Sequence, residues 1–301
     1  MTLAVVLVLV GSCAHAAWNL LAVAGRTDPR GFLLAATLVA LAACAPLAIV
    51  RLAAGGTALA DLRGALVLGA VSGLLHTAYA LSLQVAYRHG DVGVVYPVAR
   101  GVGPLLAVVA GWVLFSEAVT GVHAAGVGLV LTGVAVAAAE EQRSAPVGPG
   151  DAGSAGPAVG SAGAGLVGGL VVGTAVAAYT VWDAHAVGDR GADPVAYYLV
   201  TGLVQLLVLL AVSGAGRARR VREVVRTTPL AVVGVGLLVP TSYLLVLFAM
   251  TMAPLSVVAP LRATSVVIGA VGACVLLREG RLAPRLAAAA VVAAGVTAVG
   301  L

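Results

Sequence analysis

Long apolar runs separated by short polar stretches dominate the sequence. A helix that crosses the hydrocarbon core of a membrane needs about 20 apolar residues, and runs of that length recur throughout the chain between charged residues or Gly/Pro clusters. They predict an all-α polytopic membrane protein with ten transmembrane helices, at 2–24, 31–51, 64–87, 92–115, 121–139, 164–186, 195–213, 229–250, 255–277 and 284–301. The abundant Ala and Gly within these runs favour close helix packing.

One segment near the middle of the chain breaks this pattern. Residues 140–163 begin with charged side chains and continue in Gly, Ala, Ser and Pro, a composition typical of a flexible linker. The linker separates residues 1–139 from residues 164–301, so each half is expected to contain five spans.

Composition supports the membrane interpretation. Of the 301 residues, 61% are hydrophobic and 10% are charged, whereas soluble proteins carry roughly 25% charged residues. A soluble fold of this composition would expose large apolar areas to water, so the lipid bilayer is the expected partner. The net charge of +5 would suit nucleic acid, but the arginines lie mostly in short loops without interleaved aromatic residues. We therefore expect no nucleic-acid partner.

The arginines also predict orientation and location. All 17 basic residues are Arg, and with the Ala, Gly and Val excess this suggests a bacterial protein of the cytoplasmic (inner) membrane. Loops after odd-numbered spans contain 12 arginines and loops after even-numbered spans contain 3. Because cytoplasmic loops are enriched in basic residues, the odd loops are expected in the cytoplasm and both termini outside. The first run lacks the basic start of a signal peptide, so it is interpreted as a membrane helix.

The two halves repeat one another. Arg100 and Arg262 each follow a proline near the start of an apolar run, and Glu117 and Glu279 come seventeen residues after them, so both pairs are 162 residues apart. Other matches follow in the same order, offset by 163 to 165 residues: Trp18-Asn19 with Trp182-Asp183, Asp28-Pro29 with Asp193-Pro194, and 73–75 with 236–238. His15 then lies opposite Tyr179. Two copies of an odd number of spans must be inverted in the membrane, which is an architecture of secondary transporters.

Three motifs carry a resemblance to a known family. Residues 15–19 (HAAWN), 96–106 (YPVARGVGPLL) and 259–262 (APLR) resemble the drug/metabolite transporter superfamily, and in particular its ten-helix EamA-type members with two five-helix repeats. The resemblance covers essentially the whole chain and is moderately specific for the superfamily. It implies small-solute transport, most often export, without a tightly bound cofactor, and says almost nothing about the substrate.

Polar side chains inside the predicted spans are the candidate substrate-binding residues, because such groups are costly in lipid unless paired or hydrated. Several share a helix face, such as Ser12, His15 and Asn19, or Ser72, His76 and Tyr79. Each also has a structural interpretation as a satisfied polar or packing contact. The candidates are His15, Trp18, Asn19, His76, Tyr79, Tyr96, Arg100, Tyr179, Trp182, Asp183, Tyr243, Arg262 and Ser265.

Two arginines and one aspartate are the strongest signals among them. Arg100 and Arg262 suit a substrate carboxylate or phosphate through the planar guanidinium. Alternatively they form structural or gating ion pairs, Arg262 with Glu117 and Arg100 with Glu279. Asp183 has the chemistry to take up a proton or to bind an amino group. The alternative interpretation is a structural hydrogen bond to a neighbouring Trp or Tyr.

The expected function is secondary transport of a small polar metabolite, such as an amino acid or related solute, by alternating access between the halves. Proton coupling through Asp183 or a histidine and simple uniport fit the sequence equally. The competing hypothesis is a membrane-embedded enzyme or lipid-handling protein, but no nucleophile, metal-ligand or phosphate-loop motif supports it. No metal or cofactor is expected, and a monomer suffices, although a dimer is compatible with the sequence.

Overall fold

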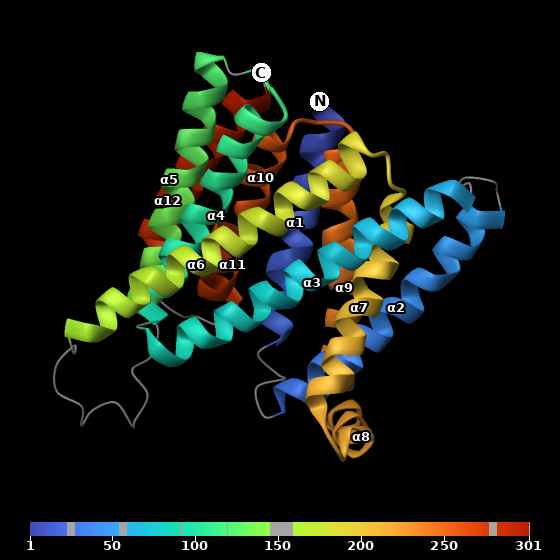
Figure 1. Cartoon of the computed structure of the whole chain (residues 1–301). Helices are drawn as coiled ribbons and strands as arrows, with labels where there is room; N and C mark the ends of the chain where they lie inside the picture. The colour runs from blue at the N-terminus through green and yellow to red at the C-terminus, as the bar shows by residue number, and fades with distance from the viewer. Residues whose placement is uncertain are drawn as a thin grey trace. The chain divides into compact units, whose positions relative to one another are not determined.

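Helices account for every regular element that the structure describes. The computed structural model describes residues 1–22, 28–53, 59–90, 92–118, 120–144, 159–276 and 282–300. In chain order the elements are α1 (Thr2–Ala22), α2 (Pro29–Ala53), α3 (Leu59–His89), α4 (Val92–Leu114), α5 (Gly121–Ser144), α6 (Val159–Ala184), the π-helical turn η3 (His185–Asp189), α7 (Pro194–Ser213), α8 (Arg217–Thr227), α9 (Pro229–Met250), α10 (Leu255–Ala263), α11 (Ser265–Leu276) and α12 (Leu282–Gly300) (Figure 1).

Most of these helices are long and apolar. Within the described residues, nine are long and apolar enough to cross a membrane, with α10 and the start of α11 counted together as Leu255–Gly272. The apolar part of α12, Leu282–Ala298, is shorter. Many aliphatic side chains point outward, including Val113 at 71% and Val67 at 67% exposure. The structure therefore supports the all-helical fold of a multi-pass membrane protein.

The helix boundaries differ from the expected ones at several places. α5 continues to Ser144 and α6 begins at Val159, so helix extends into both ends of the predicted linker, whose residues 145–158 lie outside the described ranges. The ninth predicted span is divided at Thr264 into α10 and α11. α8 was not predicted, because its mixture of Arg and Val residues contains no long apolar run.

The chain forms two compact units, each built from parts of both sequence halves. The first contains residues 1–77 and 182–253, and the second contains residues 78–181 and 254–301. α3 and α6 therefore each contribute residues to both units.

In the first unit, α2 packs against α7 and α9, and α1 packs along α9. A core of Phe32, Val224, Val232 and Val235 with their neighbours joins α2, α8 and α9, and Trp18 of α1 packs against it. Glycines allow the close contacts: a Cβ at Gly236 would lie 2.6 Å from Val39 Cβ.

In the second unit, α5 and α12 lie side by side, and α4 packs against α5 and α10 (Figure 1). Their core consists of small aliphatic residues, among them Val130, Val134, Val267 and Val292. Close approach again depends on glycine, since a Cβ at Gly133 would lie 2.5 Å from Val292 Cγ2.

Candidate functional site

Asp183 is the centre of a buried polar cluster in the first unit. It lies near the end of α6 and is completely buried. Ser72 of α3 donates a hydrogen bond to Asp183 Oδ1 over 2.7 Å, and the Tyr197 hydroxyl of α7 donates to the same oxygen over 2.7 Å. The Tyr243 hydroxyl of α9 donates to Oδ2 over 2.6 Å. Four helices thus meet at one carboxylate, and we call these four residues the Asp183 cluster.

The partners that the structure describes for Asp183 are all hydroxyl groups. An isolated carboxylate is expensive to place in a low-dielectric interior, and hydrogen bonds from several donors offset part of that cost. Hydroxyls differ from arginine or lysine in carrying no charge, so the described contacts do not make Asp183 part of a static ion pair.

His76 extends the cluster by one step along α3. Its Nδ1 lies 2.9 Å from the Ser72 carbonyl oxygen and 3.3 Å from Ser72 Oγ. Its ring also contacts the Tyr243 ring edge-on, with centroids 5.3 Å apart. A continuous series of polar contacts therefore runs from the imidazole through Ser72 to Asp183.

A second cluster, in the second unit, combines the two predicted arginines with tyrosines. The Arg100 guanidinium lies over the Tyr96 ring, 5.1 Å from its centroid, and that of Arg262 lies 5.5 Å from the Tyr179 centroid. The rings of Tyr179 and Tyr79 meet edge-on at 5.6 Å. Arg100 also interacts electrostatically with Tyr79 and Tyr179 as well as with Tyr96. We call these five residues the arginine–tyrosine cluster.

The arginine–tyrosine cluster has the chemistry of an anion site. Cation–π contacts place each guanidinium against a tyrosine ring, and a guanidinium is the side-chain group that binds a carboxylate or phosphate through paired N–H donors. Tyrosine hydroxyls can add hydrogen bonds to the same anion. The sequence had named all five residues individually; the structure brings them together from α3, α4, α6 and α10.

The carboxylate of Glu117 contacts backbone amides at the start of α10. It accepts hydrogen bonds from Leu255 N at 2.5 Å and from Ser256 N at 2.9 Å. A carboxylate suits this position because the first amides of a helix lack partners within the helix. Its predicted pairing with Arg262 stays a prediction, as does that of Arg100 with Glu279, which lies outside the described residues.

The remaining candidates lie outside these two clusters. On α1, His15 and Trp18 meet edge-on at 4.9 Å, and the Asn19 amide donates to the His15 carbonyl oxygen over 2.7 Å. Trp182 Nε1 donates to the Leu68 carbonyl oxygen over 2.9 Å, which joins α6 to α3. Ser265 is buried at the start of α11.

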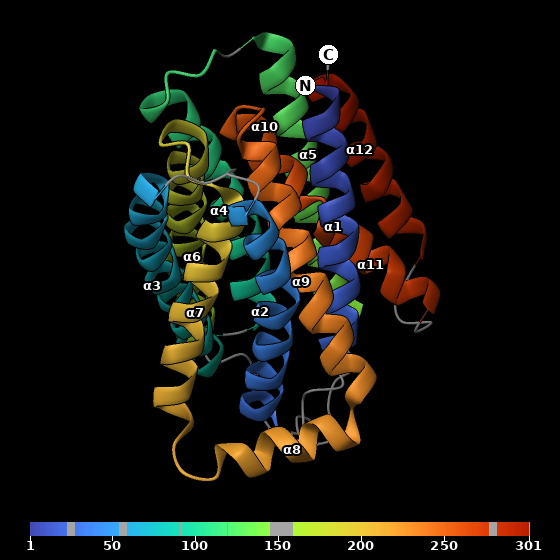
Figure 2. The same ribbon diagram turned by 90° about the vertical axis from the view of Figure 1, so that its right-hand side faces the viewer.

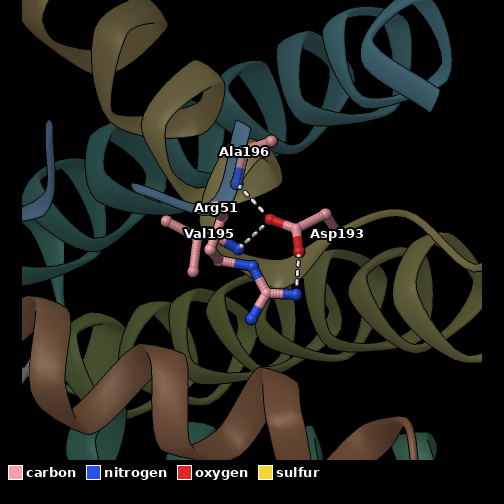
Figure 3. A network of polar contacts seen from close by, with 4 residues as sticks. All are labelled: Arg51, Asp193, Val195 and Ala196. Carbon is pink, nitrogen blue, oxygen red and sulfur yellow. Dashed lines mark hydrogen bonds and ion pairs between the residues drawn. The ribbon is translucent and has the colours of Figure 1, made fainter. Parts of the chain in front are cut away.

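An ion pair that the sequence had not suggested joins α2 to α7 (Figure 3). Arg51 Nη2 lies 2.6 Å from Asp193 Oδ2. The other oxygen of Asp193 accepts hydrogen bonds from Val195 N and Ala196 N, which caps the start of α7. Asp193 is thus both a helix cap and an ion-pair partner. In the sequence, Asp193-Pro194 was noted only as a match within the repeat, and neither role was predicted.

Comparison with known proteins shows a similar fold and identifies no family. No family model and no curated protein matches the sequence. A solved structure described as "Crystal structure of protein" superposes with a TM-score of 0.71 over 98% of this chain and 94% of that chain, at 19% sequence identity. The chain therefore shares its whole fold with a structurally characterised protein.

Proposed function

We propose that this chain is a secondary transporter, built as two inverted five-helix repeats, that moves a small polar metabolite across the bacterial cytoplasmic membrane by alternating access. Export is the proposed direction. Inverted repeats suit this function because each half can adopt the conformation of the other, giving inward-open and outward-open states of similar energy.

The observation that carries the proposal is a reciprocal contact between α5 and α12. A Cβ at Gly133 would lie 2.9 Å from the Ala288 carbonyl oxygen, and a Cβ at Gly295 would lie 2.7 Å from the Gly126 carbonyl oxygen. Gly133 and Gly295 are 162 residues apart, as are Gly126 and Ala288. Two helices related by a twofold axis make each contact twice with the partners exchanged, which is the pattern expected of a duplicated unit.

Two further helix pairs follow the same rule. A Cβ at Gly73 of α3 would lie 3.0 Å from the Thr201 carbonyl oxygen of α7, and a Cβ at Gly236 of α9 would lie 2.9 Å from the Ala36 carbonyl oxygen of α2. Gly236 follows Gly73 by 163 residues and Thr201 follows Ala36 by 165, within the range of offsets that the sequence repeat predicts. This agreement extends support for the duplication to a second part of the chain.

The Asp183 cluster is the proposed proton site. A protonated carboxyl group donates one hydrogen bond itself, so one of the three hydroxyls that now donate to Asp183 must become the acceptor of that bond or separate from it. Uptake of a proton therefore rearranges one of the three contacts that attach α3, α7 and α9 to α6. The arginine–tyrosine cluster is the proposed site for an anionic group of the substrate.

A flux experiment tests transport and proton coupling separately. Metabolites in the medium of cells with and without the protein identify exported solutes, which are then assayed in proteoliposomes with an imposed pH gradient. We expect net movement of at least one solute and a dependence on the gradient. Chemical conversion of the solute without net movement would overturn the transporter proposal in favour of a membrane-embedded enzyme.

The variant Asp183→Asn tests the proposed proton site. Asp189→Asn is the control, because the Asp189 side chain is 49% exposed and, in the described structure, pairs only with His185. We expect Asp183→Asn to retain exchange of solute across the membrane and to lose its dependence on the pH gradient. Full gradient dependence in Asp183→Asn would leave transport intact and remove Asp183 as the proton site.

A further inference from the structure

α8 is a short basic helix that lies across the ends of α7 and α9, which precede and follow it in the chain (Figure 2). The turn from α7 requires left-handed backbone at Gly214 (φ 64°) and Gly216 (φ 83°), which glycine adopts at little cost. The Arg220 guanidinium then donates to the Ser213 carbonyl oxygen, and Thr228 N donates to the Val224 carbonyl oxygen over 2.8 Å. The Arg220 contact therefore fixes α8 to the end of α7, and Thr228, which caps the end of α8, directly precedes α9.

Packing also determines which face of α8 points outward. Val224 is 5% exposed and, with Val221, packs against the core around Phe32. At 100° per residue, Arg219, Arg222 and Arg226 lie on the opposite side of the helix, and all three are exposed. The helix thus presents three arginines together, and Glu223, the one acidic residue in α8, neighbours Arg219 and Arg226 on the same exposed face.

Exposed aliphatic side chains occur in α8 and at the start of α9, close in sequence to these arginines. Val225 is 44% exposed, and Leu230, at the start of α9, is 86% exposed. Val233 and Leu237 continue the same outward face of α9, at 46% and 45% exposure. Such a row is costly in water and favourable in hydrocarbon, so the hydrocarbon boundary lies near Leu230. Arg226 lies in the last turn of α8, only four residues before Leu230 in the chain, so we place it near the level of the lipid headgroups.

We propose that α8 binds the phosphate groups of anionic phospholipids in the adjacent leaflet, and that Arg219, Arg222 and Arg226 provide the binding surface. A guanidinium matches a phosphodiester geometrically through paired N–H donors. Basic residues at an anionic membrane surface each add about fivefold to partitioning. The inference rests on the membrane placement of the apolar helices and is independent of transport.

Lipid binding to the purified full-length protein tests this surface. Native mass spectrometry in mild detergent would compare phosphatidylglycerol with phosphatidylcholine of the same acyl chains. We expect phosphatidylglycerol to bind at least about tenfold more tightly, and its binding to weaken as salt is raised, because screening reduces attraction between exposed charges. Equal affinity for the two lipids, or a preference that salt does not change, would overturn the proposal without bearing on transport.

A matched pair of variants locates the binding surface. Replacing Arg219, Arg222 and Arg226 by Gln removes three charges from α8, and replacing Arg30, Arg88 and Arg190 by Gln removes the same charge from other exposed positions. We expect only the α8 variant to lose the preference for phosphatidylglycerol. Equal loss of the phosphatidylglycerol preference in both variants would show a general effect of charge. Displacement of the lipid by soluble glycerol phosphate at the same concentration would show a site for free anions. Either result overturns the proposal. The salt dependence of the unmodified protein decides the matter if a variant does not fold.

Discussion

At the scale of single residues, Tyr197 allows the clearest measurement of the Asp183 cluster. Its side chain is fully buried and its hydroxyl donates to Asp183 Oδ1 over 2.7 Å. Tyr197→Phe removes one hydrogen bond to a carboxylate with almost no change in volume. We expect the free energy of unfolding to fall by about 1 to 2 kcal/mol, measured by denaturant unfolding in detergent.

The neighbouring tyrosine provides a matched control. Tyr198 is also buried, but the contact described for it is between its ring and that of Tyr243, with centroids 5.8 Å apart. Tyr198→Phe keeps this ring contact, so its free energy of unfolding should change by less than about 0.5 kcal/mol. Equal effects of the two substitutions would mean that the hydroxyl of Tyr197 does not stabilise the cluster.

The sequence predicted part of this cluster. Asp183, His76 and Tyr243 were candidates because polar groups within apolar helices are costly, and Ser72 was recognised on the same face as His76. Tyr197 was missed. Two adjacent tyrosines near the start of a helix point in directions about 100° apart, and only the packing of α7 against its neighbours determines which of them reaches a partner.

At the scale of helices, the close glycine contacts between α5 and α12 allow a test of how packing affects stability. A Cβ at Gly133 would meet Val292 Cγ2 at 2.5 Å and the Ala288 carbonyl oxygen at 2.9 Å, so Gly133→Ala must push the two helices apart. We expect the free energy of unfolding to fall by about 1 to 3 kcal/mol, by thermal or denaturant unfolding. Gly295→Ala, whose Cβ would lie 2.7 Å from Val130 N, should have a similar cost.

Gly128→Ala is the control on the same helix. A Cβ at Gly128 would meet nothing within 4 Å, so this substitution should be neutral or mildly stabilising, because Ala is the better helix former. A loss of stability in Gly128→Ala as large as that in Gly133→Ala would indicate that α5 tolerates no side chain at either position, and that the contact with α12 is not the cause.

The ion pair between α2 and α7 allows a second test at this scale. Asp193→Ser keeps a side-chain oxygen that can cap α7 but removes the charge, and Arg51→Gln removes the other charge. Because the Arg51 side chain is 38% exposed, solvent screening limits the coupling free energy of this pair to about 1 kcal/mol. A double-mutant cycle of unfolding free energies measures it, and additive effects of the two substitutions would show that the pair contributes nothing.

Helix composition determines what could be predicted at this scale. Membrane spans are recognisable because an uncharged apolar run of about 20 residues matches the thickness of the hydrocarbon core. α8 was missed because an 11-residue helix of mixed Arg and Val has no such run and is stabilised by Val224 packing against α2 and α9. The division at Thr264 was also missed. The hydropathy of the span is continuous across this residue, whereas the regular backbone hydrogen bonding of the helix is interrupted there.

At the scale of the whole chain, sequence order and packing divide the molecule differently. The repeat divides the sequence at the linker, whereas each compact unit combines residues from both halves. The proposed duplication accounts for the first division, because it copies a continuous segment. Packing accounts for the second, because the helices that pack against one another come from different sequence halves, such as α5 with α12 and α2 with α7.

The distribution of arginines along the whole chain also predicts its orientation in the membrane. The sequence assigns 12 arginines to the odd loops and 3 to the even loops; one of the 12, Arg285, is buried in α12. The excess of the other 11 still places the linker and α8 in the cytoplasm and the loop around Arg190 outside. Alkaline phosphatase, which is active only outside the cytoplasm, should be inactive when fused after residues 145 and 220 and active when fused after residue 190. The opposite pattern would invert the orientation and would move α8 and its proposed lipids to the outer leaflet. Because α6 and α7 both lie between the linker and α8, activity at only one of residues 145 and 220 would mean that one of these helices does not cross the membrane, which would contradict the five-plus-five arrangement itself.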